Sequence, residues 1–104
     1  MALDTKTTSS LARLGRYRDI VREFGSDPSK VATLPNPDQQ LIIAHALTFT
    51  GHYDAAQRVV LANRESASGS RRSKCEFILG ILARKRGNFE TALQQFQLAK
   101  RLAH

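Results

Sequence analysis

Three histidines and one cysteine are the residues of this chain best suited to metal binding or nucleophilic chemistry. His45, His52 and His104 do not fall at metal-ligand spacing, and Cys75 has no second cysteine as a partner. We therefore expect no metal ion. Cys75 leads into an apolar run, so we interpret it as a core residue, and we interpret His45 as a core or binding-surface residue rather than a ligand.

The other residue types used in catalysis do not form a recognisable site. The chain has no glycine-rich phosphate loop; its glycines serve turns and helix packing, and Gly80 is expected to allow close approach of a neighbouring helix. Its nine acidic residues are scattered rather than paired. Its serines cluster near the N-terminus and in one loop, without the context of a nucleophile. We expect no catalytic residue, no cofactor and no enzymatic activity.

The charge of the chain favours an anionic partner. The formal net charge is +7, and residues 73–104 hold six Lys or Arg against two acids. Such a field attracts acidic protein segments, nucleic acid or a membrane surface. The alternative is a solvated helical surface that simply uses many arginines.

Three similar ten-residue segments follow one another at a fixed interval of 36 residues: GRYRDIVREF, GHYDAAQRVV and GNFETALQQF. Each segment begins with a glycine and has an aromatic residue two positions later. Ile20, Ala56 and Ala92 share the next apolar column, and Phe24, Val60 and Phe96 the one after it. A period of this length is typical of repeat proteins, in which neighbouring units bury faces that no single unit can bury.

The offsets between apolar residues are those of helices. After Phe89 they recur at three, four and seven positions, so Phe89, Ala92, Leu93 and Phe96 share one face of a helix, and we expect this face to form the buried seam with the neighbouring helix. Glycine commonly ends a helix because it adopts the left-handed conformation at least cost. The sequence therefore predicts an all-α protein of helix, glycine turn and helix. The expected helices cover residues 7–14, 16–25, 37–50, 52–64, 71–86 and 88–103, in units of about 1–36, 37–72 and 73–104 within one domain.

The third unit resembles the tetratricopeptide repeat most closely. Its matching residues are Leu79-Gly80, Gly87-Asn88-Phe89, Ala92, Phe96 and Ala99. The second unit matches through Ile43-Ala44, Gly51-His52-Tyr53, Ala56 and Val60, whereas the first is degenerate, with Thr7-Thr8 at the Leu-Gly position. The resemblance implies a right-handed superhelical array of antiparallel helix hairpins, an α-solenoid. It also implies a protein-binding role as adaptor, chaperone or regulatory scaffold.

The same resemblance implies a concave groove lined by the first helix of each unit. Carried onto this chain, the groove positions are Asp38, Leu41, Ile42, His45, Thr48 and Phe49 in the second unit, and Lys74, Phe77, Ile78, Ile81, Arg84 and Lys85 in the third. The groove floor would be apolar and its rim at the third unit basic. An apolar segment carrying acidic residues would suit it. The alternative is that these residues are ordinary core.

Partners other than a peptide in this groove are also considered. The nucleic-acid alternative uses the basic surface of the last unit, with its densest group at Arg71, Arg72, Lys74, Arg84, Lys85 and Arg86. Aromatic residues are not interleaved with these cations, which favours a protein partner. The last helix has no polar capping helix after it. We therefore expect either a longer parent protein or a homodimer or heterocomplex through the third unit.

The chain shows no apolar secretory segment, and no apolar run approaches the roughly 18 residues that span a membrane. These features predict a cytoplasmic protein without a membrane partner.

Overall fold

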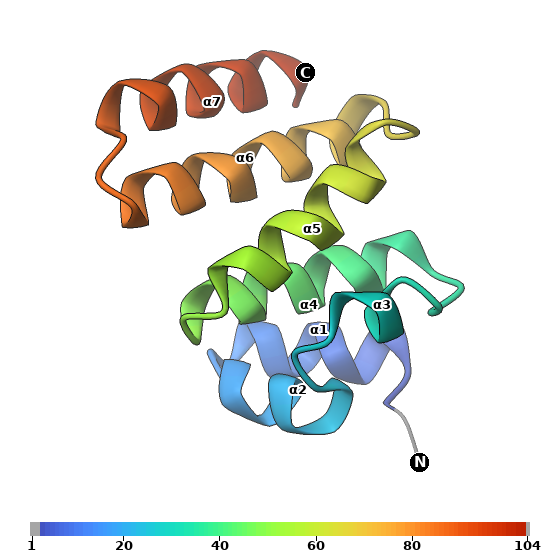
Figure 1. The fold of residues 1–104 in the computed structure, drawn as a ribbon. Helices are drawn as coiled ribbons and strands as arrows, with labels where there is room; N and C mark the ends of the chain where they lie inside the picture. The colour runs from blue at the N-terminus through green and yellow to red at the C-terminus, as the bar shows by residue number, and fades with distance from the viewer. Residues whose placement is uncertain (1–2, 104) are drawn as a thin grey trace. The chain divides into compact units, whose positions relative to one another are not determined.

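The computed structural model describes residues 3–103, and every regular element in this range is a helix. This confirms the all-α prediction. Met1, Ala2 and His104 lie outside the described residues, and so does the expectation that His104 is not a metal ligand. The helices are α1 (Thr5–Arg13), α2 (Tyr17–Phe24), α3 (Pro28–Val31), α4 (Pro37–Phe49), α5 (Tyr53–Arg64), α6 (Gly69–Lys85) and α7 (Phe89–Leu102) (Figure 1).

The three predicted glycine turns are present and have the same hydrogen bonds. Gly15, Gly51 and Gly87 have φ of 73°, 88° and 83°. The backbone N–H of the residue after each glycine donates a hydrogen bond to the carbonyl oxygen five residues before it. The Arg16 N–H donates to the Leu11 carbonyl at 2.9 Å, and the corresponding bonds after Gly51 and Gly87 are 2.9 and 2.8 Å long. Each glycine donates to the residue three before it. This is the Schellman pattern of helix termination, so the 36-residue sequence repeat is also a repeat of local structure.

The short helix α3 was not expected from the sequence. The expected helices leave a gap between residues 25 and 37, but Asp27 caps a further turn there by accepting a hydrogen bond from the Ser29 N–H at 2.9 Å, and Pro28 occupies the first helical position. Val31 from this turn is buried. The Asp-Pro pair therefore starts a helix here instead of only ending the previous one.

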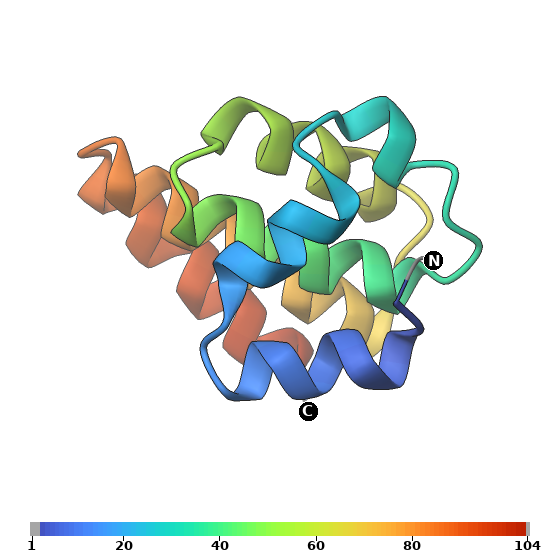
Figure 2. The ribbon, with the colours of Figure 1, turned by 90° about the horizontal axis from the view of Figure 1, so that it is seen from below.

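The chain divides into two compact units between Val59 and Val60, within α5. In the first unit, α1 and α2 contact each other and both pack against α4 (Figures 1 and 2). Its buried core includes Ile20, Ile43 and Leu47. The Gln39 side chain donates to the Leu3 carbonyl at 2.8 Å and to Thr8 Oγ1 at 3.3 Å, which ties α4 to the start of α1.

The second unit is built around the antiparallel pair α6 and α7. Gly80 allows the close approach, because a Cβ atom there would lie 2.6 Å from Phe96 Cε1. Ala92 and Ala99 of α7 are buried, and the Ser73 hydroxyl of α6 donates a hydrogen bond to the Ala99 carbonyl at 2.6 Å. The predicted role of Gly80 in helix packing is therefore confirmed.

The predicted packing of α7 is wrong for two residues. Phe89 and Leu93 were expected in the buried seam with Ala92 and Phe96, but their side chains are exposed, and Phe89 is 69% accessible. The inward face of α7 is centred on the two alanines instead. Leu93 follows Ala92 directly, so it lies about 100° around the helix from this buried alanine, and Phe89 lies in the first turn.

A buried carboxylate joins α6 to the end of α5. Glu76 is fully buried, and its Oε1 lies 2.5 Å from Arg64 Nε and 3.2 Å from Arg72 Nε. Both arginine side chains are 34% exposed, so their charge is only partly removed from water. A buried charge is tolerated when it is paired, and removal of one partner leaves the other uncompensated.

We predict that Glu76→Gln lowers the free energy of unfolding by about 2–3 kcal/mol, less than for a fully buried pair because both arginines reach water. Urea unfolding followed by circular dichroism measures this change. The matched control is Glu65→Gln, on the exposed loop that follows α5, which should change stability by less than about 0.5 kcal/mol. Equal effects of the two substitutions would contradict a stabilising role for the buried pair.

Candidate binding surfaces

Helix α4 carries the groove residues predicted for the second repeat (37–72), and they differ in accessibility. Leu41 and Thr48 are buried, whereas Asp38, Ile42 and His45 are half-buried. Phe49, in the last turn of the helix, is 44% exposed. Leu41 therefore belongs to the core, and the accessible part of this set lies at the C-terminal end of α4.

Three rings stack at this end of α4. Tyr17, at the start of α2, lies 4.9 Å from Phe49 between ring centroids, with an interplanar angle of 10°. His45 lies 4.9 Å from Phe49 and 5.6 Å from Tyr17. Stacked rings stabilise one another beyond the area that they bury. The stack therefore holds the Phe49 ring in place although nearly half of it is accessible.

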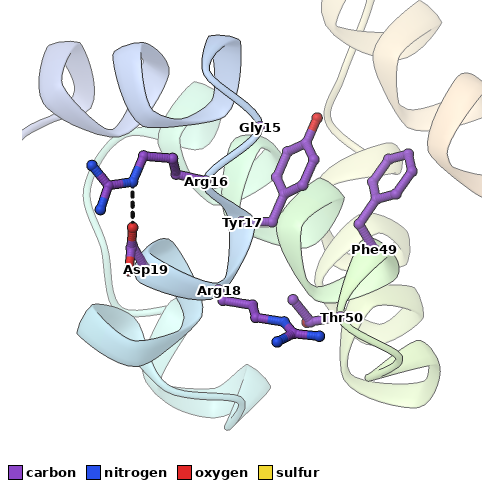
Figure 3. A pocket seen from close by; sticks show the side chains of 7 residues that line it. All are labelled: Gly15, Arg16, Tyr17, Arg18, Asp19, Phe49 and Thr50. Carbon is purple, nitrogen blue, oxygen red and sulfur yellow. Dashed lines mark hydrogen bonds and ion pairs between the residues drawn. The ribbon is translucent and has the colours of Figure 1, made fainter.

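A pocket opens beside the stack, within the first unit. Its volume is about 300 Å³, and it lies between the turn before α2 and the end of α4 (Figure 3). The lining residues are Gly15, Arg16, Tyr17, Arg18, Asp19, Phe49 and Thr50. The pocket thus combines an aromatic wall with two cationic side chains.

The two arginines of the pocket are in different electrostatic situations. Arg16 Nε lies 2.6 Å from Asp19 Oδ2, and Arg22 also approaches the same carboxylate at 3.4 Å. Arg18 is exposed, extends toward Thr50 in Figure 3, and forms no ion pair with a described carboxylate. Arg18 is therefore the side chain with charge available for an incoming anion, next to an apolar ring.

Burial also sets the charge of the stack. Desolvation lowers the pKa of His45 below its ordinary value of 6.5, so its imidazole is neutral at pH 7. The stack therefore presents an uncharged aromatic wall, and the positive charge of the pocket comes from the arginines.

The groove residues predicted for the third repeat (73–104), which lie in the second compact unit, also divide into two groups. Ile78 and Ile81 are buried in the core. The exposed members are Lys74, Phe77, Arg84 and Lys85. Phe77 is 45% exposed, and its ring centroid lies 5.6 Å from that of Phe96. The Arg84 guanidinium lies 5.9 Å from the centre of the Phe96 ring. This surface is again an aromatic cluster with a cation beside it.

The residues that sequence reasoning missed come from the second helices. Tyr17 stands in the aromatic column of the repeat, and Arg16 and Arg18 flank it, but none of the three is among the predicted binding residues. The position of the two arginines on either side of a repeat aromatic, directly after a helix turn, is the signal that could have drawn attention to them. Nothing in the spacing indicated that Tyr17 would meet His45 and Phe49.

The basic residues of the second unit are partly engaged within the unit. Arg72 pairs with Glu76, and Arg84 contacts an aromatic ring.

The Cys75 thiol is buried, and burial, helped by the neighbouring Glu76 charge, raises its pKa, so the thiol is protonated at neutral pH. Across residues 3–103, no cluster of three or more metal-ligating side chains is found. No described helix is both long enough and apolar enough to cross a membrane.

Comparison of the chain with protein-family models, curated protein sequences and solved structures finds no match.

The lowered pKa of His45 gives a prediction for stability against pH. Because the unfolded imidazole binds a proton near pH 6.5 and the folded one only at lower pH, this histidine contributes stability above pH 6.5 that is lost as the pH falls through the folded pKa. We expect the wild type to lose more stability than His45→Gln between pH 7.5 and 5. Urea unfolding at each pH measures both proteins. The same pH dependence in both would contradict a desolvated, neutral His45.

Proposed function

We propose that this chain is a protein-interaction module of the tetratricopeptide type, with its hairpins arranged as a right-handed α-solenoid. In this proposal it works as an adaptor, chaperone or regulatory scaffold and carries no enzymatic activity. The recurrence of one turn geometry at Gly15, Gly51 and Gly87 supports the repeat architecture. We place the protein in the cytoplasm, where a single unpaired cysteine stays reduced.

The observation that carries the binding role is the exposed Phe49 ring in the pocket, with the exposed Arg18 beside it. The rings supply apolar contact, and the guanidinium supplies a charge-assisted hydrogen bond to a carboxylate. A peptide segment with a large apolar residue next to an Asp or Glu has the matching chemistry. Aromatic and arginine side chains are also the types that dominate binding energy at protein interfaces.

Nucleic-acid binding through the cations of the second unit is the second candidate, supported by the net charge of +7. Within this group, Arg72 and Arg84 already have partners within the chain. The salt dependence of binding separates the two functions, because phosphate contacts release counterions and binding then weakens steeply with salt.

The pocket is tested with synthetic peptides that carry Phe or Leu next to Asp or Glu, added to the isotope-labelled full chain and followed by NMR. We expect shifts at Tyr17, Arg18, Phe49 and Thr50. Phe49→Ala and Arg18→Ala should each weaken binding about tenfold, as expected for interface anchors. A peptide in which Lys replaces every acid should not bind.

The matched control is Arg58→Ala, which removes another exposed arginine, on α5 in the same unit and not among the residues that line the pocket. It changes the net charge by the same amount as Arg18→Ala, so it should leave peptide affinity within about twofold. If Arg58→Ala and Arg18→Ala weaken binding equally, attraction is by overall charge, and the pocket is not the binding site. Failure of all such peptides to bind at millimolar concentration would also reject it.

A further inference from the structure

Helix α7 carries an apolar stripe that faces solvent. Phe89 is 69% and Leu93 is 57% exposed, and the half-buried Phe96 continues the same face. Lys100 stands at the end of the stripe, one turn beyond Phe96, and is exposed. Two large, accessible apolar side chains one turn apart on one helix are typical of an interaction surface.

The spacing of this stripe is the same in both directions. Phe89, Leu93, Phe96 and Lys100 are separated by four, three and four residues. Reversal of the helix leaves these intervals unchanged, so an antiparallel copy of α7 has the same register. In that arrangement Leu93 of each copy lies opposite Phe96 of the other, and Phe89 lies opposite Lys100. This is the self-complementarity that a two-fold interface requires.

The charges of α7 favour the same arrangement. Glu90 lies in the first turn, and Lys100 and Arg101 lie in the last. Antiparallel pairing brings the acidic end of one helix to the basic end of the other, and it also opposes the two helix dipoles. Parallel pairing would put Lys100 and Arg101 beside their own copies. Opposite ends of the helix thus complement each other, and like ends repel.

We propose that α7 pairs antiparallel with α7 of a second copy of this chain, forming a reversible homodimer through Phe89, Leu93 and Phe96. The aliphatic stem of Lys100 covers the Phe89 ring of the other copy, with its ammonium group near Glu90. The contact involves one helix from each chain, so it belongs to the small, transient class of interfaces. This surface does not include the pocket beside Phe49, and the inference stands independently of the proposed function.

Sedimentation velocity of the full chain between about 10 µM and 1 mM, the range expected for small interfaces, tests the dimer. We expect a concentration-dependent shift from monomer to dimer. Leu93→Glu should abolish the shift, because it places two carboxylates in the centre of the stripe. The matched control Gln94→Glu adds the same charge at the next exposed position, off the stripe, and should retain the dimer.

A charge reversal tests the antiparallel register. Glu90→Lys alone should weaken the dimer about two- to fivefold, and Glu90→Lys combined with Lys100→Glu should restore it. Circular dichroism of each variant verifies that the helices are intact. A strict monomer at 1 mM, or a dimer that Leu93→Glu and Gln94→Glu affect equally, would overturn the proposal. Failure of the double reversal to restore affinity would overturn the antiparallel arrangement.

Discussion

The structure depends on how its helices end. Each of the three repeated turns reverses the chain with a glycine at positive φ, and the residue after the glycine hydrogen-bonds back to the last turn of the preceding helix. Side chains other than glycine are strained in this conformation, and the final carbonyls of a helix need partners. This constraint sets where each second helix begins, and therefore which of its faces returns to the first.

The second recurring feature is a small residue on each first helix. Thr8, Ala44 and Gly80 are 36 residues apart, and all three are buried. At Gly80 the Phe96 ring occupies the space that a Cβ would need. The missing side chain of Gly80 thus makes room for a bulky ring of α7, whereas Phe89 and Leu93 of the same helix are exposed.

The sequence predicted the helix order, the glycine turns and the role of Gly80, because each depends on local conformation or on a strict interval. It did not predict α3, where Asp27-Pro28 acts as a helix start after acting as a stop. It misplaced Phe89 and Leu93, because a helical period identifies an apolar face about 100° wide but not which edge of that face meets the neighbour. The pocket beside Phe49 depends on Tyr17 meeting a helix that begins twenty residues later, and such a contact has no local signal.

The buried thiol of Cys75 has a practical consequence. It is the only cysteine in the chain, and its raised pKa and lack of solvent access protect it from alkylation in the folded state. Reaction with a thiol reagent therefore requires α6 to separate from its neighbours, and the labelling rate reports how often this opening occurs. The second unit thus contains an intrinsic reporter of its own breathing motions, readable by mass spectrometry on the unmodified chain.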